Sequence, residues 1–188
     1  IDYAKDFHLG KMLGIDLPGE VNGFLPSKSW KKDTFNEKWY LGDTYNLSIG
    51  QGYLLATPLQ ASILMSYFAN NGKVNKPYLV KNTDIKEINR DIILTNLISS
   101  DNLDIIRRGL RKTVTDGTAK SMNSIPVNVA GKTGTAQFHN KKIPHSWFAG
   151  FAPYEDSKIT ISILVEEGGD NGIAIIVARE FLEWYFSQ

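Results

Sequence analysis

The sequence predicts an α/β protein of the α+β type, in which an antiparallel β-sheet packs against helices. Three observations predict this class. Two apolar stripes with helical spacing lie in the middle of the chain, three strand-like runs follow one another closely, and a strongly apolar helix closes the sequence. Because polar connections of hairpin length join the three runs, we expect consecutive antiparallel strands.

The composition indicates a globular domain. The chain has 188 residues, enough for one domain with a hydrophobic core and too few for two large ones. With 42% hydrophobic and 22% charged residues, it is not of the disordered class. The 21 basic residues nearly balance the 20 acidic ones, which argues against nucleic-acid binding and against an anionic membrane surface. The absence of cysteine excludes disulfides, thiolate metal sites and a cysteine nucleophile.

The N-terminal quarter carries few regular signals. The opening "IDYAKDFHLG" has the pattern of the end of a helix and lacks an initiator methionine, so we expect a fragment or a processed piece. Residues 11–52 are rich in Gly, Pro, Asn, Asp and aromatics without periodicity, and predict a long loop. A buried helix then follows, with Thr57 as its N-cap, Pro58 at its first position and Asn71-Gly72 as its stop. Its apolar face comprises Leu59, Ile63, Leu64, Tyr67 and Phe68.

A second helix is predicted in residues 99–117, where acidic side chains lie in the first turn and basic ones toward the end. Its apolar stripe is Leu103, Ile106, Leu110 and Val114. Residues 127–137, 146–152 and 159–166 are expected to form the three strands, with Trp147, Phe148 and Phe151 in the core. The segment after the Asn171-Gly172 turn is expected to form a helix on this sheet.

The tripeptide Lys132-Thr133-Gly134 lies on the first of these strands. Alone it is a weak signal, and it also fits an exposed strand with a solvated lysine and a glycine bulge. However, Gly131 and Gly134 both interrupt the strand, which weakens a sheet unless something approaches the backbone closely. Lys132 and the hydroxyls of Thr133 and Thr135 supply one cation and two donors, which suit a carboxylate. The strand is therefore predicted to bind an anion beside a reacting group.

The motifs around this strand resemble a known family. "GKTGTAQ" is followed by "HSWFAGFAP" and preceded by "GIDLPGE", "GDTYNLSIGQGYLLATPLQ" and "DGTAKS". From about Asp2 onward, this set resembles the transpeptidase domain of class B penicillin-binding proteins, in particular the elongation type. The resemblance implies that residues 1–188 are the C-terminal portion of one such domain, without its nucleophile-bearing N-terminal portion. It also implies a serine acyl-transferase that cross-links peptidoglycan and is acylated by β-lactams.

The resemblance further implies roles for four residues. Lys132 would hydrogen-bond the serine of an S-x-N motif that precedes this sequence, and would act in catalysis. Thr133 and Thr135 would bind the substrate carboxylate, the backbone N–H of Thr135 would form half of an oxyanion hole, and Gly134 would keep the strand edge clear.

The resemblance implies no cofactor and no metal. The implied partners are peptidoglycan stem peptides, β-lactams, the N-terminal part of the domain, a membrane glycosyltransferase and a periplasmic scaffold protein of rod-shape elongation, with no nucleic acid. The implied location is the periplasmic face of the inner membrane, with the anchor outside this sequence.

Two segments match the other motifs of that family, and we interpret both as chance matches. Residues 29–32, "SWKK", fit S-x-x-K, and residues 100–102, "SDN", fit S-x-N. A nucleophilic serine motif should begin a buried, mostly apolar helix, whereas Ser29 precedes a polar stretch that we expect to be a loop. Ser100 is instead expected to be the N-cap of the second helix.

Other interpretations remain open. His8, His139 and His145 are too scattered to predict a metal site and are expected on the surface or in loops. A carbohydrate- or peptide-binding module without chemistry would also have an anion-binding strand. A regulatory sensor of the penicillin-binding type would react with β-lactams and would not process peptidoglycan.

Overall fold

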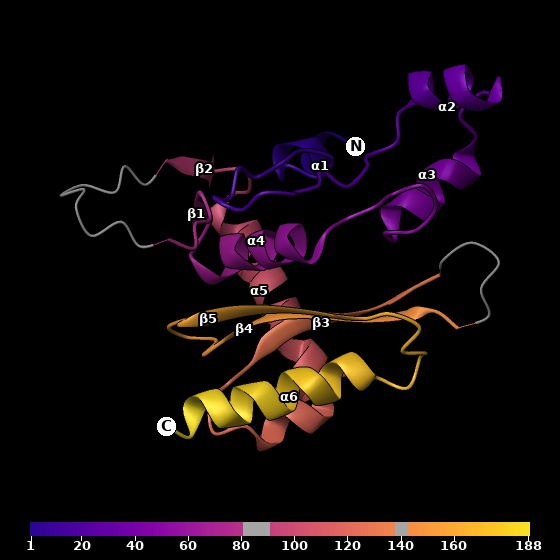
Figure 1. Ribbon diagram of the computed structural model, residues 1–188. Helices are drawn as coiled ribbons and strands as arrows, with labels where there is room; N and C mark the ends of the chain where they lie inside the picture. Colours follow the sequence, from indigo (N-terminus) through magenta and orange to yellow (C-terminus); the bar gives the residue numbers. More distant parts are fainter. Residues whose placement is uncertain (81–90, 138–142) are drawn as a thin grey trace. The chain divides into compact units, whose positions relative to one another are not determined.

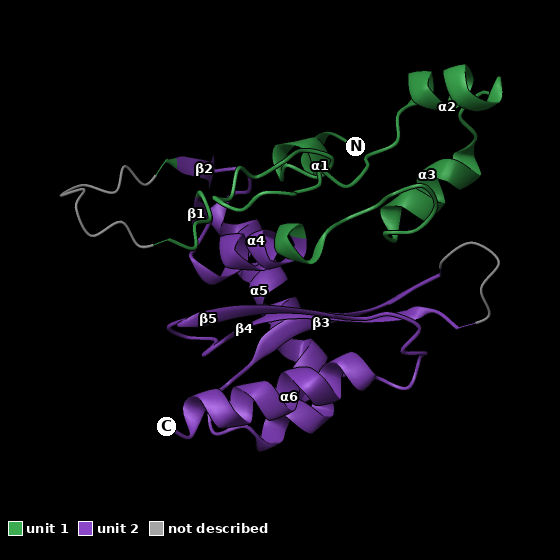
Figure 2. Cartoon of the chain, in the orientation of Figure 1, with its two compact units in different colours: residues 1–60, 76–91 green, residues 61–75, 92–188 purple. Residues whose placement is uncertain are grey.

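The computed structural model describes residues 1–80, 91–137 and 143–188, and Figure 1 shows its elements along the chain. The chain divides into two compact units, which Figure 2 colours separately. The first comprises residues 1–60 with 76–91, and the second comprises residues 61–75 with 92–188. The assignment of the whole chain to one domain stays a prediction.

The described residues of the first unit include three short helices, α1 (Asp2–Asp6), α2 (Lys28–Phe35) and α3 (Leu41–Ser48). The helix expected at the very start is confirmed, whereas the long loop expected over residues 11–52 is wrong because it contains α2 and α3. The N–H of Trp30 donates to the hydroxyl of Ser27 at 3.0 Å, so Ser27 caps α2. The Trp30 ring also packs against Phe24 and Tyr53, with centroids 4.7 and 5.0 Å away. This aromatic packing stabilises a helix whose composition is otherwise polar.

An ion pair joins α2 to α3. The Nζ atom of Lys31 lies 2.6 Å from Oδ2 of Asp43, and the side chain of Lys31 is only 5% exposed. The hydrogen bond from Lys31 lowers the pKa of Asp43, and the N–H of Tyr40 lowers it further. The same hydrogen bond raises the pKa of Lys31. Both groups are therefore charged together over a wide range of pH.

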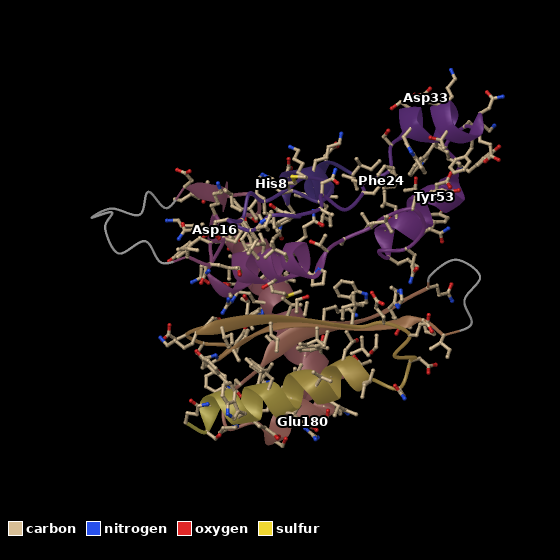
Figure 3. All side chains as sticks on the ribbon, viewed as in Figure 1. His8, Asp16, Phe24, Asp33, Tyr53 and Glu180 are labelled. Atoms are coloured by element: carbon tan, nitrogen blue, oxygen red, sulfur yellow. The ribbon has the colours of Figure 1, made fainter. Side chains whose placement is uncertain are left out.

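This pair predicts how stability depends on pH. Because the pKa of Asp43 is lowered by folding, its contribution is complete above the ordinary value of 3.8 and is lost as the pH falls below that value. The contribution of Lys31, whose pKa is raised, is complete below 10.5 and is lost above it. Denaturant unfolding of Asp43→Asn should show a weaker loss of stability below pH 4 than the unsubstituted chain. Asp33→Asn, at an exposed position of α2 (Figure 3), is the control and should keep the full acid dependence.

One buried side chain organises the loops of the first unit. Gln60 is 2% exposed, and the two N–H groups of its Nε2 are shared among the carbonyl oxygens of His8, Lys11 and Asn22, which lie within hydrogen-bond distance. Its backbone N–H donates to the hydroxyl of Thr57 at 3.1 Å, and its Oε1 accepts from the N–H of Thr57 at 3.0 Å. The predicted N-cap at Thr57 is therefore confirmed.

The second unit holds the sheet. Its three-stranded sheet has the order β3-β4-β5, and both pairs are antiparallel. The predicted consecutive antiparallel strands are confirmed, although β3 begins at Ala130 rather than Val127. A small pair β1-β2 was not predicted. The remaining bounds are β1 Lys73–Asn75, β2 Ile92–Thr95, β3 Ala130–Ala136, β4 His145–Ala152, β5 Ile159–Val165, α4 Pro58–Ala69, α5 Ser100–Thr115, the 3₁₀ helix η1 Lys120–Ser124 and α6 Ile173–Phe186.

The two faces of this sheet have different neighbours. Phe148 of β4 is fully buried and belongs to the core cluster that includes Ala174, Ala178 and Leu182 of α6. Figure 1 shows α6 lying along this face. On the opposite face, the hydroxyl of Thr160 in β5 lies 3.1 Å from that of Ser66 in α4. The sheet of the second unit is thus covered by helices on both faces. The predicted packing of helices against the sheet is confirmed, whereas their division between two faces was not predicted.

The core contains most of the predicted aromatic residues. Phe148 and Phe151 are fully buried, as expected, whereas the expectation for Trp147 is wrong, because its side chain is half-buried and lines a cavity.

The cap of α5 also differs from the prediction. Ser99 is its N-cap residue, and Ser100 is already the first helical residue.

Candidate active site

The K-T-G tripeptide lies on β3, at the edge of the three-stranded sheet. Among the strands that the structure describes, β4 pairs with one side of β3 and none pairs with the other. A ligand that lies along the strand would meet this outer side, where no described strand pairs. An open edge is therefore the first property of this candidate site.

Alternation along β3 divides the predicted site residues between two faces. Thr133 pairs with Phe148, and Thr135 pairs with Ser146, so both threonines lie on the face that α6 covers. Lys132 pairs with Ala149 and lies on the opposite face. Its exposed ammonium donates to the backbone carbonyl of Thr133 at 2.8 Å.

A cavity of about 640 Å³ opens beside β3 on the α6 side. Thr133, Gly134 and Thr135 all line it, whereas Lys132 does not. Most of the lining residues that remain belong to the turn before α6 and to α6 itself, and two of them carry charge, namely Asp170 and Arg179. The structure thus brings together three of the four predicted site residues in a concave, polar setting.

Thr118 contributes a further hydroxyl that the sequence analysis did not assign. Its Oγ1 lies 2.8 Å from Oγ1 of Thr133, and either atom can be the donor. Thr118 lies in the segment between α5 and η1 and also lines the cavity. The only sequence signal was the "DGTAKS" segment, which gave no reason to pair this threonine with β3. The hydrogen bond restricts the side chain of Thr133 to an orientation toward the cavity.

The two glycines of β3 differ in how much space a side chain would have. A Cβ atom on Gly131 would lie 2.6 Å from the carbonyl oxygen of Ala149 and 2.6 Å from the ring of Phe148. Gly131 is therefore required by packing within the sheet rather than by an approaching ligand. A Cβ atom on Gly134 would lie 3.2 Å from Cβ of Trp147, which is a tight contact but not a prohibitive one.

The two chance matches lie in contexts unlike a buried nucleophile. The loop expected after Ser29 is wrong, since α2 places Ser29 and Lys32 one turn apart on a helix. Both residues are exposed, however, and the hydroxyl of Ser29 lies 3.0 Å from that of Ser27. Ser100 is also exposed, and its hydroxyl donates to Asp101 at 3.4 Å. Neither serine lies in the cavity beside β3.

In the described ranges 1–80, 91–137 and 143–188, no group of three or more His, Asp or Glu side chains is arranged to hold a metal ion. Burial lowers the pKa of His8, and the charge of Lys11 lowers it further. Nδ1 of His145 accepts from the N–H of Glu167, while His139 lies outside the described residues. None of the described helices combines the length and the apolar character needed to cross a bilayer.

Comparison with known proteins gives a consistent result over the whole chain. Residues 1–183 match the family described as penicillin binding protein transpeptidase domain. The chain is 32% identical to the peptidoglycan D,D-transpeptidase MrdA of Haemophilus influenzae, over 100% of this chain and 32% of that protein. The chain therefore spans about a third of the length of the curated relatives it matches.

Solved structures agree with this match. PBP2 of Pseudomonas aeruginosa, in complex with WCK 5153, superimposes with a TM-score of 0.83 at 32% identity, covering 97% of this chain and 42% of that one. PBP2 of Helicobacter pylori in its complex with MreC gives a TM-score of 0.81 at 31% identity, covering 99% and 35% respectively. At these identities, the likeness extends to sequence as well as to fold.

Proposed function

The chain belongs to the penicillin-binding protein transpeptidase domain family, and from this premise we propose that the complete protein is a serine-type peptidoglycan D,D-transpeptidase of cell-wall elongation. In this proposal the chain supplies the K-T-G wall of the active site. The observation that carries it is the edge strand β3, whose two threonines line a cavity on one face and whose exposed Lys132 lies on the other. Such an edge suits a peptide that ends in a carboxylate.

The proposed reaction assigns a task to each group. A serine in the part of the complete protein that precedes this chain attacks the carbonyl carbon of the penultimate D-alanine, and the terminal D-alanine leaves. The amine of a second stem peptide then takes the acyl group and releases the serine. Thr133 and Thr135 bind the carboxylate of the donor, and the N–H of Thr135 stabilises the oxyanion together with the N–H of the serine. Lys132 supports proton transfer through a serine of the S-x-N motif.

Partners and location belong to the same proposal. PBP2 of Helicobacter pylori forms a complex with MreC, which supports a scaffold protein as a partner of the complete protein. We also propose a membrane glycosyltransferase as a partner, and the periplasmic face of the inner membrane as the location. β-Lactams are the proposed inhibitors.

Labelling with a fluorescent penicillin tests this function. Residues 1–188 alone should form no covalent adduct, because acyl transfer needs an activated nucleophile and two oxyanion donors. The complete protein should be labelled, and mixing this chain with the N-terminal portion should restore labelling on a serine of that portion. Ser29→Ala and Ser100→Ala in the complete protein are matched controls that should leave labelling unchanged.

Two outcomes would contradict the proposal. Mass spectrometry that locates the penicilloyl group on Ser29 or Ser100 would show that the nucleophile lies in this chain. A complete protein that reacts with penicillin and fails to cross-link peptidoglycan stem peptides would instead be a sensor.

A further inference from the structure

The carboxylate site of the proposed function lacks an evident cation on the face where its hydroxyls lie. Thr133 and Thr135 face the cavity on the α6 side, whereas Lys132 lies on the opposite face of β3 and outside the cavity lining. Hydroxyl donors without a positive charge bind carboxylates less tightly than charge-assisted donors do. A cation on the α6 side is therefore the missing part of this site.

Arg179 of α6 is the basic residue that lines the same cavity as these threonines in the described part of the chain. Ile175 and Ile176, which precede it by about one helical turn, line the cavity as well. The side chain of Arg179 is 33% exposed, so it is neither deeply buried in the core nor free in solvent. A partly exposed guanidinium at the cavity wall can contact a ligand in the cavity.

Arg179 forms an i,i+4 ion pair with Glu183, and one of its donors has no hydrogen-bond partner in the described part of the chain. Its Nε is buried and has no hydrogen-bond partner among the described residues. The nearest carboxylate is that of Glu183, whose Oε1 lies 3.7 Å from this Nε, beyond hydrogen-bond distance. The same Oε1 accepts a hydrogen bond from Ser124 at 2.9 Å. Because a buried donor without a partner is costly and the ion pair with Glu183 is long, the partly exposed guanidinium is suited to donate to a further anionic partner.

We propose that Arg179 is the cation of the carboxylate subsite, so that it determines specificity for ligands with a free carboxylate. This inference rests on the proposed function. The planar guanidinium donates in pairs to a carboxylate, and Thr133, held by Thr118, donates beside it. Asp170, the other charged lining residue, opposes a second anion and so favours a ligand with a single carboxylate.

The test compares benzylpenicillin with its methyl ester, which lacks the free carboxylate. The second-order rate of acylation of the complete protein is measured for both compounds by mass spectrometry. Arg179→Gln should lower the rate with benzylpenicillin about 10- to 100-fold, the loss of one charge-assisted pair, and should leave the rate with the ester nearly unchanged. Arg179→Lys keeps the charge without the planar fork and should recover part of the preference. Arg108→Gln, at an exposed position of α5, is the matched control and should keep the full preference.

The outcomes separate this inference from the proposed function. A loss of preference for the free carboxylate in Arg179→Gln, with partial recovery in Arg179→Lys, supports it. An equal fall in the acylation rate with both compounds indicates a structural role for Arg179 and overturns the inference. An unchanged preference in both variants also overturns it. In either case the transpeptidase proposal stands. If Arg179→Gln does not fold, Arg179→Lys alone tests the inference. Full retention of the preference for the free carboxylate in Arg179→Lys overturns it, and so does an equal loss of acylation rate with both compounds. If neither compound acylates the unsubstituted complete protein, the proposed function fails and the inference fails with it.

Discussion

Replacing Lys132 by alanine in the complete protein is expected to lower the rate of acylation by benzylpenicillin about tenfold or more. The melting temperature should remain nearly unchanged, because the side chain is exposed and its bond to the Thr133 carbonyl is local. A positioned cation beside the nucleophile supports proton transfer, which contributes more to the rate than an exposed lysine contributes to stability. Stopped-flow acylation and differential scanning calorimetry measure the two effects separately.

Lys112→Ala is the matched control for this experiment. Lys112 is an exposed lysine in the last turn of α5, and its replacement removes the same charge at a distance from β3 along the chain. The control should acylate at the rate of the unsubstituted protein. Equal rates in Lys132→Ala and in the control would refute a catalytic role for Lys132. A large fall in melting temperature would assign the lysine to the fold instead.

Gly131→Ala is expected to destabilise this chain by about 1–3 kcal/mol, since an added methyl group must displace either the Phe148 ring or the Ala149 carbonyl. Phe148 is fully buried between the sheet and α6, so its ring has little room to move. Denaturant unfolding followed by circular dichroism measures the change in the free energy of unfolding.

Gly109→Ala is a control that should change the free energy of unfolding in the opposite direction. Gly109 lies within α5, and nothing lies within 4 Å of a Cβ atom added there. Alanine in a helix is favoured over glycine, so this variant should be more stable by about 0.5–1 kcal/mol. Equal stability of the two variants would mean that β3 tolerates a side chain before the lysine.

The elements that the sequence predicted correctly are those with a strong local pattern. α5 and α6 follow from apolar periodicity, and the capping residues Thr57 and Pro58 predicted the start of α4. α2 was missed because its sequence is polar and its stability comes from the Trp30 cluster and the Lys31–Asp43 pair. Those contacts join residues that are distant in sequence, and local propensity does not report them.

In the candidate site, too, residues with a local sequence signal were predicted and residues placed by tertiary packing were not. The K-T-G residues were predicted from their chemistry, whereas the division of Lys132 and Thr133 between opposite faces of β3 was not predicted and comes from the strand register in the structure. Thr118 and Arg179 were not predicted, because their places in the cavity depend on how α6 and the segment before η1 pack on the sheet. Neither residue carries a sequence signal of its own for this role.

The two outer strands of the sheet differ in their resistance to aggregation. β3 carries a charged residue, Lys132, and charge on an edge strand opposes pairing with a foreign strand. β5 has no charge and no proline in its seven residues, and every second residue, from Ile159 to Val165, is apolar and β-branched. Neither outer edge is paired within the described residues. We therefore expect intermolecular strand pairing during refolding to involve β5 rather than β3, because the charge of Lys132 opposes such pairing at the β3 edge.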